Sequence, residues 1–139
     1  MIILDTNVVS ELMKPAPAGR VFGWIAAQPA SALYTTSITQ AEILHGLALL
    51  PKGKRRNALE SAAEGMLRED FAGRILPFGS DAAQAYARIA ADRRRAGHPI
   101  SHFDAQIAAI ARSAGAAIAT RNVTGYDRCG VKILNPWDV

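Results

Sequence analysis

The sequence contains little of what would place the protein in a membrane or an oxidising compartment. A single cysteine, Cys129, excludes an internal disulfide framework and is typical of proteins from a reducing cytoplasm. The first apolar run, residues 1–4, ends at Asp5 and is far shorter than a signal-peptide core or a membrane span. We therefore expect a cytoplasmic protein with no membrane partner.

Histidine, linkers and repeats are equally scarce. His45, His98 and His102 form no cluster with one another or with the one cysteine, so a zinc site is not expected. No linker, repeat or low-complexity tract divides the chain, and 139 residues suit one domain, which we place at 1–139. The composition, 50% hydrophobic and 20% charged, excludes intrinsic disorder.

Positive charge is present in modest excess, with 16 Lys and Arg against 12 Asp and Glu and a net charge of +4. A positive field attracts phosphate polymers but specifies none of them. One basic cluster holds Lys52, Lys54, Arg55 and Arg56, and another spans residues 93–95. We interpret Lys52, Lys54 and Arg55 as candidate RNA contacts. Solvated helix ends are an equally good interpretation of residues 93–95.

Apolar runs with strand character alternate with helical segments along the whole chain. This alternation predicts an α/β domain with a mostly parallel central sheet. We expect strands at residues 1–4, 32–36, 74–77, 117–119 and 131–134. Helices are expected near residues 8–13, 18–27, 40–49 and 53–70. Two more are expected after N-caps at Ser80 and Ser101, ending before Gly97 and Gly115.

Three acids, Asp5, Glu42 and Asp104, each stand where a short apolar run gives way to a helix. In a parallel sheet the carboxyl ends of the strands meet at one edge, so these acids are expected to share a pocket. Clustered carboxylates repel one another unless a cation joins them. Oxygen-only ligands favour Mg²⁺ or Mn²⁺, so the pattern predicts a divalent metal site.

Helix capping offers a structural alternative for each acid. Thr39 with Glu42 matches a capping box, and Ser101 with Asp104 matches the related Ser-x-x-Asp pattern. Residues 5–7, Asp-Thr-Asn, also suit a turn or a helix entry. Capping does not require all three acids to follow different strands of one sheet, so their coincidence favours the shared site.

Five motifs extend this pattern over essentially the whole chain. They are Ile3-Leu4-Asp5-Thr6-Asn7, Ser37-Ile38-Thr39-Gln40-Ala41-Glu42-Ile43, Phe103-Asp104-Ala105-Gln106-Ile107-Ala108, Ala119-Thr120-Arg121-Asn122 and Asn135-Pro136-Trp137. In this order they resemble the successive motifs of PIN-domain ribonucleases, and most closely the VapC and FitB-like toxins of bacterial toxin–antitoxin modules. Any one motif is weak, whereas five in order are specific.

The resemblance implies a PIN-like three-layer α/β/α fold and a Mg²⁺-dependent RNA endonuclease that hydrolyses phosphodiester bonds with a metal-activated water. It also implies a homodimer held inactive by a cognate antitoxin. Ala-rich and Leu-rich helices such as residues 43–50 agree with a dimer interface, because they are apolar on more than one face.

The resemblance assigns roles to residues at the matching positions. Asp5 and Asp104 are the expected direct metal ligands, and Glu42 is expected to act through water or as a general base. Thr6 supplies a supporting oxygen. At the fourth motif, Thr120 and Asn122 would hold water or phosphate, and Arg121 would either contact substrate or be an ordinary surface residue.

The sequence departs from the family pattern after Thr120-Arg121, where an acid is commonly found. Asn122 and Gly125 occupy those positions, and the nearest acid, Asp127, stands in a different register. Asn122 offers an amide oxygen but no charge. An alternative is therefore a catalytically impaired PIN-like protein that binds RNA or a partner without cleaving.

A second rival is a phosphotransferase that forms an aspartyl-phosphate at Asp5. Such sites pair the nucleophile with a nearby second acid, and here Thr6 and Asn7 follow it. This reading is disfavoured. The RNA target stays open, because specificity resides in surface residues and RNA shape.

Overall fold

A parallel sheet of five strands forms the centre of the computed structural model, which describes all 139 residues. The strands are β1 (Ile2–Leu4), β2 (Leu33–Thr36), β3 (Ile75–Leu76), β4 (Ala117–Ala119) and β5 (Ile133–Leu134). Their spatial order is β3-β2-β1-β4-β5, and every neighbouring pair is parallel. The predicted parallel sheet is confirmed, with the N-terminal strand at its centre.

The central position of β1 follows from its composition. Ile3 and Leu4 have no exposed surface, and Ile2 pairs with Leu33 on one side and Ala117 on the other. A strand that carries apolar side chains on both faces is stable only when helices cover both faces of the sheet.

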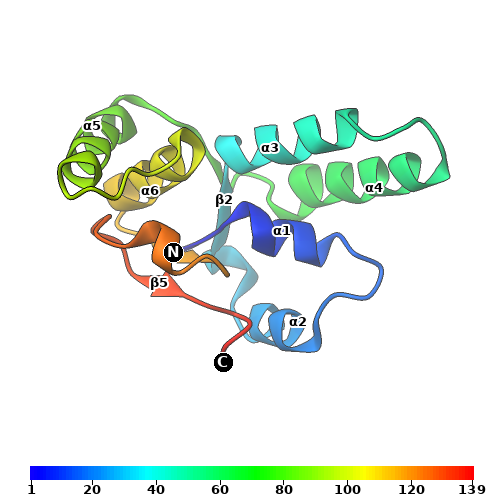
Figure 1. Cartoon of the computed structure of the whole chain (residues 1–139). Helices are drawn as coiled ribbons and strands as arrows, with labels where there is room; N and C mark the ends of the chain where they lie inside the picture. The colour runs from blue at the N-terminus through cyan, green and yellow to red at the C-terminus, as the bar shows by residue number, and fades with distance from the viewer.

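Helices flank the sheet on both sides (Figure 1). Alternate residues of β1 serve different faces: Ile3 belongs to the apolar cluster that includes residues of α5 (Ser80–Arg95) and α6 (His102–Ala114). Leu4 belongs to the cluster that includes residues of α1 (Thr6–Leu12), α2 (Gly19–Ala26), α3 (Ser37–Ala48) and α4 (Lys54–Gly65). The predicted three-layer α/β/α arrangement is confirmed.

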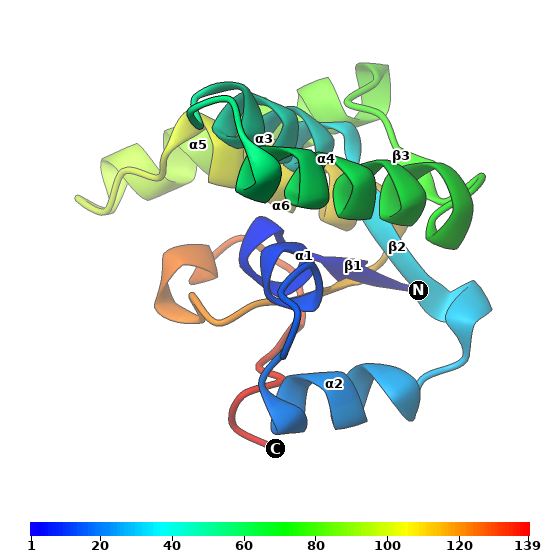
Figure 2. The same ribbon diagram turned by 90° about the vertical axis from the view of Figure 1, so that its right-hand side faces the viewer.

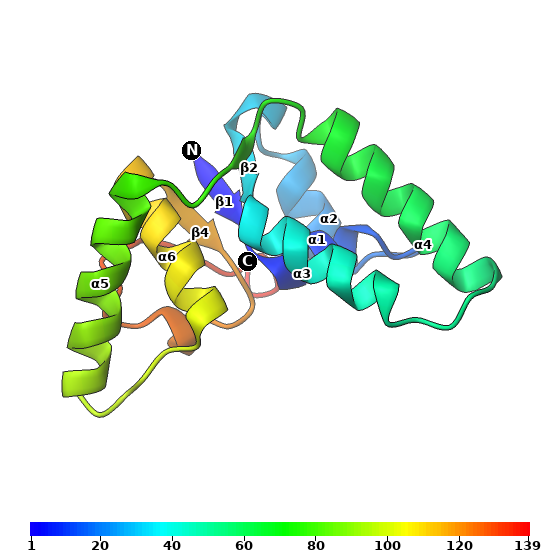
Figure 3. The same cartoon turned by 90° about the horizontal axis from the view of Figure 1, so that it is seen from above.

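Two helical hairpins diverge when the molecule is viewed from above (Figure 3). The α3–α4 hairpin is extended by a π-helical turn at Met66–Asp70, and the α5–α6 hairpin lies on the other side. Figure 2 shows α2 and the C-terminus at the bottom of the molecule, with these hairpins at the top. None of the helices is long and apolar enough to cross a membrane.

Two helix starts differ from the sequence prediction. Helix α3 begins at Ser37 because Thr36 is its N-cap, with Thr36 Oγ1 accepting the Thr39 N–H at 3.1 Å. The capping-box interpretation of Thr39 and Glu42 is therefore wrong. Gly79, without a side-chain hydrogen bond, caps α5, so Ser80 is its first residue and not its cap.

The third correction concerns α6, which follows α5 directly and not a strand. The prediction that Asp104 stands at a strand-to-helix junction is therefore wrong. Its location at the expected edge has another cause: α6 runs back across the sheet into β4, so its first turn lies at the carboxyl edge of the parallel strands (Figure 3). The predicted Ser101 cap is confirmed, because Ser101 Oγ accepts the Asp104 N–H at 3.2 Å.

Candidate functional site

Asp5 joins the central strand to the first helix at the carboxyl edge of the sheet. Its N–H donates to the Ala119 carbonyl of β4 at 3.0 Å, and its Oδ1 accepts the Thr6 N–H at 2.8 Å. Its Oδ2 accepts the Thr120 hydroxyl at 2.8 Å. With 4% of its surface exposed, the Asp5 side chain has a fixed position set by two strands and one helix.

The direction of the Thr120 bond follows from the rest of its contacts. Thr120 Oγ1 accepts the Asn7 side-chain amide at 3.1 Å and the Asn122 N–H at 3.0 Å. A hydroxyl has one proton and two acceptor lone pairs, so the proton of Thr120 must go to Asp5. Thr120 thus orients the Asp5 carboxylate, and Asn122 contributes its backbone N–H to the same network.

Glu42 is linked to Asp5 through Thr6. The Thr6 hydroxyl donates to Glu42 Oε1 at 2.8 Å and lies 3.0 Å from the Thr39 hydroxyl. Because the single Thr6 proton goes to the carboxylate, Thr39 donates to Thr6. The side chain of Glu42, in the second turn of α3, is thereby held at the same edge as Asp5.

Asp104 is held by a residue that the sequence analysis did not single out. Its Oδ1 accepts the Tyr126 hydroxyl at 3.3 Å, and this is the hydrogen bond that the Tyr126 side chain makes. The signal for Tyr126 was present in the sequence, because a tyrosine in an otherwise polar loop requires a partner for its hydroxyl if its ring is buried.

Burial is the largest influence on the pKa values of Asp5 and Glu42. It raises the pKa of Asp5 more than hydrogen bonds from Thr120 and Thr6 lower it, and the charge of Asp104 raises it further. Burial also raises the pKa of Glu42, which Thr6 lowers in part and the charges of Asp5 and Asp104 raise again. No cationic side chain contributes to either pKa, so the negative charge is not balanced from within the chain.

The donor set fits a hard divalent cation. Only oxygens converge here, and Asp5 and Asp104 are near enough for the charge of Asp104 to raise the pKa of Asp5. No three His, Cys, Asp or Glu side chains are packed tightly enough to form a metal-binding group by themselves. Mg²⁺ commonly takes one or two carboxylates and completes its shell with water, so a site built on Asp5 and Asp104, with Glu42 acting through water, suits both observations.

Asn122 and Gly125 occupy the positions of the family acid, and Asp127 is the nearest acid to them. A Cβ added at Gly125 would lie 2.2 Å from Asn122 Nδ2, so the exposed Asn122 side chain occupies the space that a side chain at position 125 would need. The carbonyl of Asp127 accepts a bond from Arg93 Nη1 at 2.8 Å. Neither Asn122 nor Asp127 contributes to the pKa of Asp5 or Glu42.

The candidate RNA-binding cations lie at different distances from the acids. The backbone of Arg121 follows Thr120 and its N–H donates to Asn7 Oδ1 at 3.2 Å, whereas its guanidinium lies 5.2 Å from the Trp137 ring centroid. Lys52, Lys54 and Arg55 are exposed at the tip of the α3–α4 hairpin (Figure 3), beyond the end of α3.

The interpretation of Arg93 as a solvated helix end or an RNA contact is wrong. Arg93 is 6% exposed and donates to the carbonyls of His98, Gly125 and Asp127 at 2.6, 3.0 and 2.8 Å. It is therefore neither a solvated helix end nor free for phosphate. Its charge binds the loop that follows β4.

Comparison with known proteins agrees with this geometry. The PIN domain model matches residues 2–128. The chain is 44% identical over 138 residues to VapC ribonuclease Y4jK of Sinorhizobium fredii, with 99% of both chains covered. It is 39% identical to Toxin FitB of Neisseria gonorrhoeae, again with 99% of each chain covered. The crystal structure of FitAcB from Neisseria gonorrhoeae superimposes with a TM-score of 0.92 at 39% identity, over 100% of both chains.

Proposed function

The chain belongs to the PIN-domain family, and we propose that it is a Mg²⁺- or Mn²⁺-dependent RNA endonuclease that acts as the toxin of a toxin–antitoxin module. One observation carries the catalytic part of the proposal. Asp5, Glu42 and Asp104 converge at the carboxyl edge of the sheet, are held by hydroxyl groups, and have no cationic partner in the chain. Residues 1–139 are proposed to act as one domain.

Each residue of the site has a separate proposed role in phosphodiester hydrolysis. Asp5 and Asp104 would hold the ion, and Thr120, Thr6 and Tyr126 fix the orientation of these carboxylates. A bound divalent ion lowers the pKa of water, offsets phosphate charge and orients in-line attack.

Glu42 is the proposed general base. Its pKa is raised by burial and by the two neighbouring acids, so its carboxylate accepts a proton more readily than an ordinary glutamate does. The Thr6 hydroxyl bond occupies Oε1 and leaves Oε2 available for water. Arg121, whose backbone follows Thr120, is a proposed contact for the RNA backbone, and Lys52, Lys54 and Arg55 would engage RNA at the tip of the α3–α4 hairpin.

Protein partners follow from the same assignment. We propose pairing with a cognate antitoxin and association into a homodimer in the cytoplasm. Leu44 and Leu49 of the α3 segment are 50% and 71% exposed, whereas Ile43 and Leu47 of the same helix are buried in the core. A helix that presents apolar side chains to the core and to solvent favours a second protein surface.

The test is RNA cleavage by the purified full-length chain, free of antitoxin, with Mn²⁺ or Mg²⁺ and with EDTA. We expect cleavage with either ion, none with EDTA, and none by Asp5→Asn. Asp138→Asn, the same change at an exposed acid near the C-terminus, is the matched control and should cleave normally. Cleavage that persists in EDTA would contradict the proposal.

The packing of Asn122 over Gly125 favours a second candidate, a PIN-like protein that binds RNA or its partner without cleaving. Under this alternative the wild type would bind RNA with the same affinity as Asp5→Asn and would cleave none in any metal. The cleavage assay therefore separates the two functions.

A further inference from the structure

We propose that the Tyr126 hydroxyl is the fourth polar group of the site, a positioning residue that fixes Asp104 and replaces the acid missing at positions 122 and 125. This inference rests on the proposed function, because it assigns Tyr126 a part in holding the metal ligands. It extends that function, since neither the motifs nor the family resemblance pointed to this residue.

The Tyr126 side chain spans from the core to the acids. It is 1% exposed, and its ring belongs to the apolar cluster that contains Ile107, Ile118 and Cys129. The hydroxyl at the end of the ring lies 3.3 Å from Asp104 Oδ1. A ring fixed by close packing holds its hydroxyl more rigidly than a flexible side chain at the surface would.

The loop that carries Tyr126 is itself fixed by the buried arginine. Arg93 Nη1 donates to the carbonyls of Gly125 and Asp127, the residues on either side of Tyr126. A buried cation bonded on both sides of one residue restrains the backbone at that residue. These hydrogen bonds explain why Arg93 is buried, which neither a solvated helix end nor an RNA contact would explain.

The alternative positions supply no fourth group in this chain. Gly125 has no side chain, and the Asn122 amide lies over it, 2.2 Å from where a Cβ would be. Asn122 reaches Thr120 through its backbone N–H. Tyr126 reaches Asp104 because its side chain is long and its ring approaches from the core side.

A tyrosine and an acid differ in what they give the site. The hydroxyl contributes one donor and no charge, so it stabilises an ionised carboxylate without adding to the repulsion between Asp5 and Asp104. Groups that hydrogen-bond to metal ligands typically change metal affinity 10–100-fold when they are removed. We expect a change of that size here.

The experiment is calorimetric titration of the metal-free, full-length protein with Mn²⁺ alone. Tyr126→Phe removes one atom and should raise the Kd for Mn²⁺ roughly 10–100-fold. Tyr34→Phe, which removes a hydroxyl from a partly buried ring on β2 packed against the same cluster, is the matched control and should bind as the wild type does. In an Asp104→Asn background the added Tyr126→Phe change should have a much smaller effect, because the two residues act through one contact.

A kinetic measurement separates positioning from general damage to the fold. At low Mn²⁺, Tyr126→Phe should lower kcat for RNA cleavage with little change in KM, and excess Mn²⁺ should restore kcat. Because metal binding also stabilises the folded state, the circular dichroism spectrum of the variant at the same low Mn²⁺ must match that of the wild type. If kcat stays low at saturating Mn²⁺, the positioning role is wrong.

The outcomes distinguish this inference from the proposed function. A wild type that binds no Mn²⁺ overturns both. Equal Mn²⁺ affinity in the wild type and Tyr126→Phe overturns the role of Tyr126 alone. Should Tyr126→Phe fail to fold, Arg93→Lys supplies the test, because a lysine cannot bond the Gly125, Asp127 and His98 carbonyls with the same fork. Unchanged affinity in Arg93→Lys would then overturn the proposal.

Discussion

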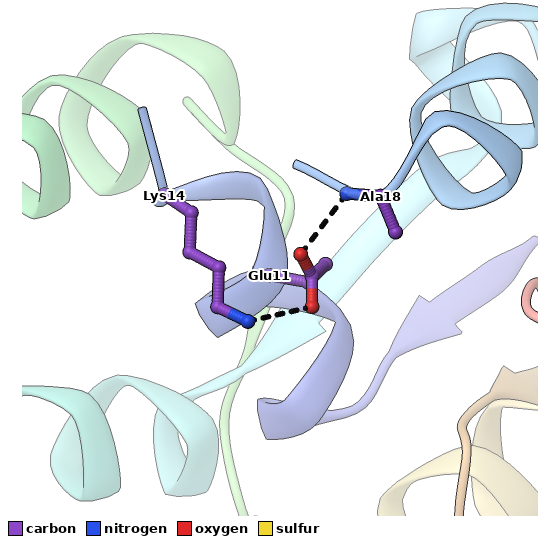
Figure 4. A network of polar contacts seen from close by, with 3 residues as sticks. All are labelled: Glu11, Lys14 and Ala18. Atoms are coloured by element: carbon purple, nitrogen blue, oxygen red, sulfur yellow. Dashed lines mark hydrogen bonds and ion pairs between the residues drawn. The ribbon is translucent and has the colours of Figure 1, made fainter. Parts of the chain in front are cut away.

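Helix α1 carries two buried acids whose pKa values are shifted in opposite directions, Asp5 at its N-cap and Glu11 in its last turn. Glu11 accepts the Lys14 ammonium at 3.0 Å and the Ala18 N–H at 3.1 Å (Figure 4). These bonds, that of Lys14 first, lower the pKa of Glu11. Asp5 accepts only uncharged donors, and burial raises its pKa.

Glu11 is an acid that stabilises the fold through an ion pair, whereas Asp5 is an acid without a cationic partner. Glu11 ties α1 to the start of α2, and its charge is balanced by Lys14, just past the end of its own helix (Figure 4). The charge of Asp5 is positioned but not balanced, and Asp104 adds to it. Positioned negative charge without a local cation is what a metal site needs, because an internal lysine would compete with the ion.

The sharpest test of this comparison is catalytic. Asp5→Asn should lower RNA cleavage at least ~1,000-fold, about 4 kcal/mol of transition-state stabilisation, because it removes a proposed ligand while preserving shape. Glu11→Gln should leave the rate per folded molecule within about threefold. Both are measured with one RNA and saturating Mn²⁺. Similar losses in the two variants would show that the acids do not differ in function.

Metal binding should also stabilise the folded protein. At a hundredfold excess of Mn²⁺ or Mg²⁺ over its Kd we expect about 2.7 kcal/mol, seen as a rise in Tm over the EDTA-treated protein. The same ions should give Glu11→Gln an equal increment. No rise in Tm for the wild type would argue that the unbalanced acids bind no divalent ion.

Asp104→Asn should invert the sign of a stability effect. Without metal it removes one of the mutually repelling charges and should raise the free energy of unfolding by on the order of 1 kcal/mol. With metal it should lose most of the increment seen in the wild type. A residue that served only as a helix cap would cost about 0.5–2 kcal/mol under both conditions, which is the result that would contradict a metal role.

Much of the fold was predictable because β1 is apolar on both faces. That pattern requires a sheet covered on both sides, and the parallel order follows from the helices between strands. The helix starts were less predictable, since Thr36 and Thr39 are both good caps. The choice of Thr36 is favoured by the Thr39 hydroxyl, which in the folded protein bonds to Thr6.

The site was predictable only where chemistry lies within a motif. Asp5, Glu42 and Asp104 were identified from residue type and position, although Asp104 reaches the edge through α6 and not from a strand. Tyr126 and Arg93 could not be assigned this way. Their roles come from contacts between α5, α6 and the loop after β4, which depend on packing of segments far apart in the chain.

The smallest predicted effect is the dependence of stability on pH, and it tests the comparison by sign alone. For Glu11 the folded pKa is lowered from 4.5, so its ionised form stabilises the protein above that value. This stability is lost as the pH falls through the lowered pKa. For Asp5 the folded pKa is raised from 3.8, so the protein is relatively more stable below 3.8 and loses that advantage as the pH rises through the raised pKa.

The free energy of unfolding should therefore respond oppositely in the two variants. In metal-free buffer, Glu11→Gln should be less stable than the wild type at neutral pH and should approach it as the pH falls toward about 3. Asp5→Asn should lose least, or gain, at neutral pH, where the wild type bears the cost of an unbalanced buried charge. Denaturant titrations between about pH 3 and pH 8 measure both differences.

Lys14→Met is the control, because it removes the first cause of the lowered Glu11 pKa. It should reduce the pH dependence of stability that comes from Glu11 and leave that from Asp5 intact. If the stability of Glu11→Gln and of Asp5→Asn relative to the wild type changed with pH in the same direction, the two acids of α1 would contribute to stability in the same way. The distinction between an acid that stabilises the fold and an acid without a cationic partner would then be wrong.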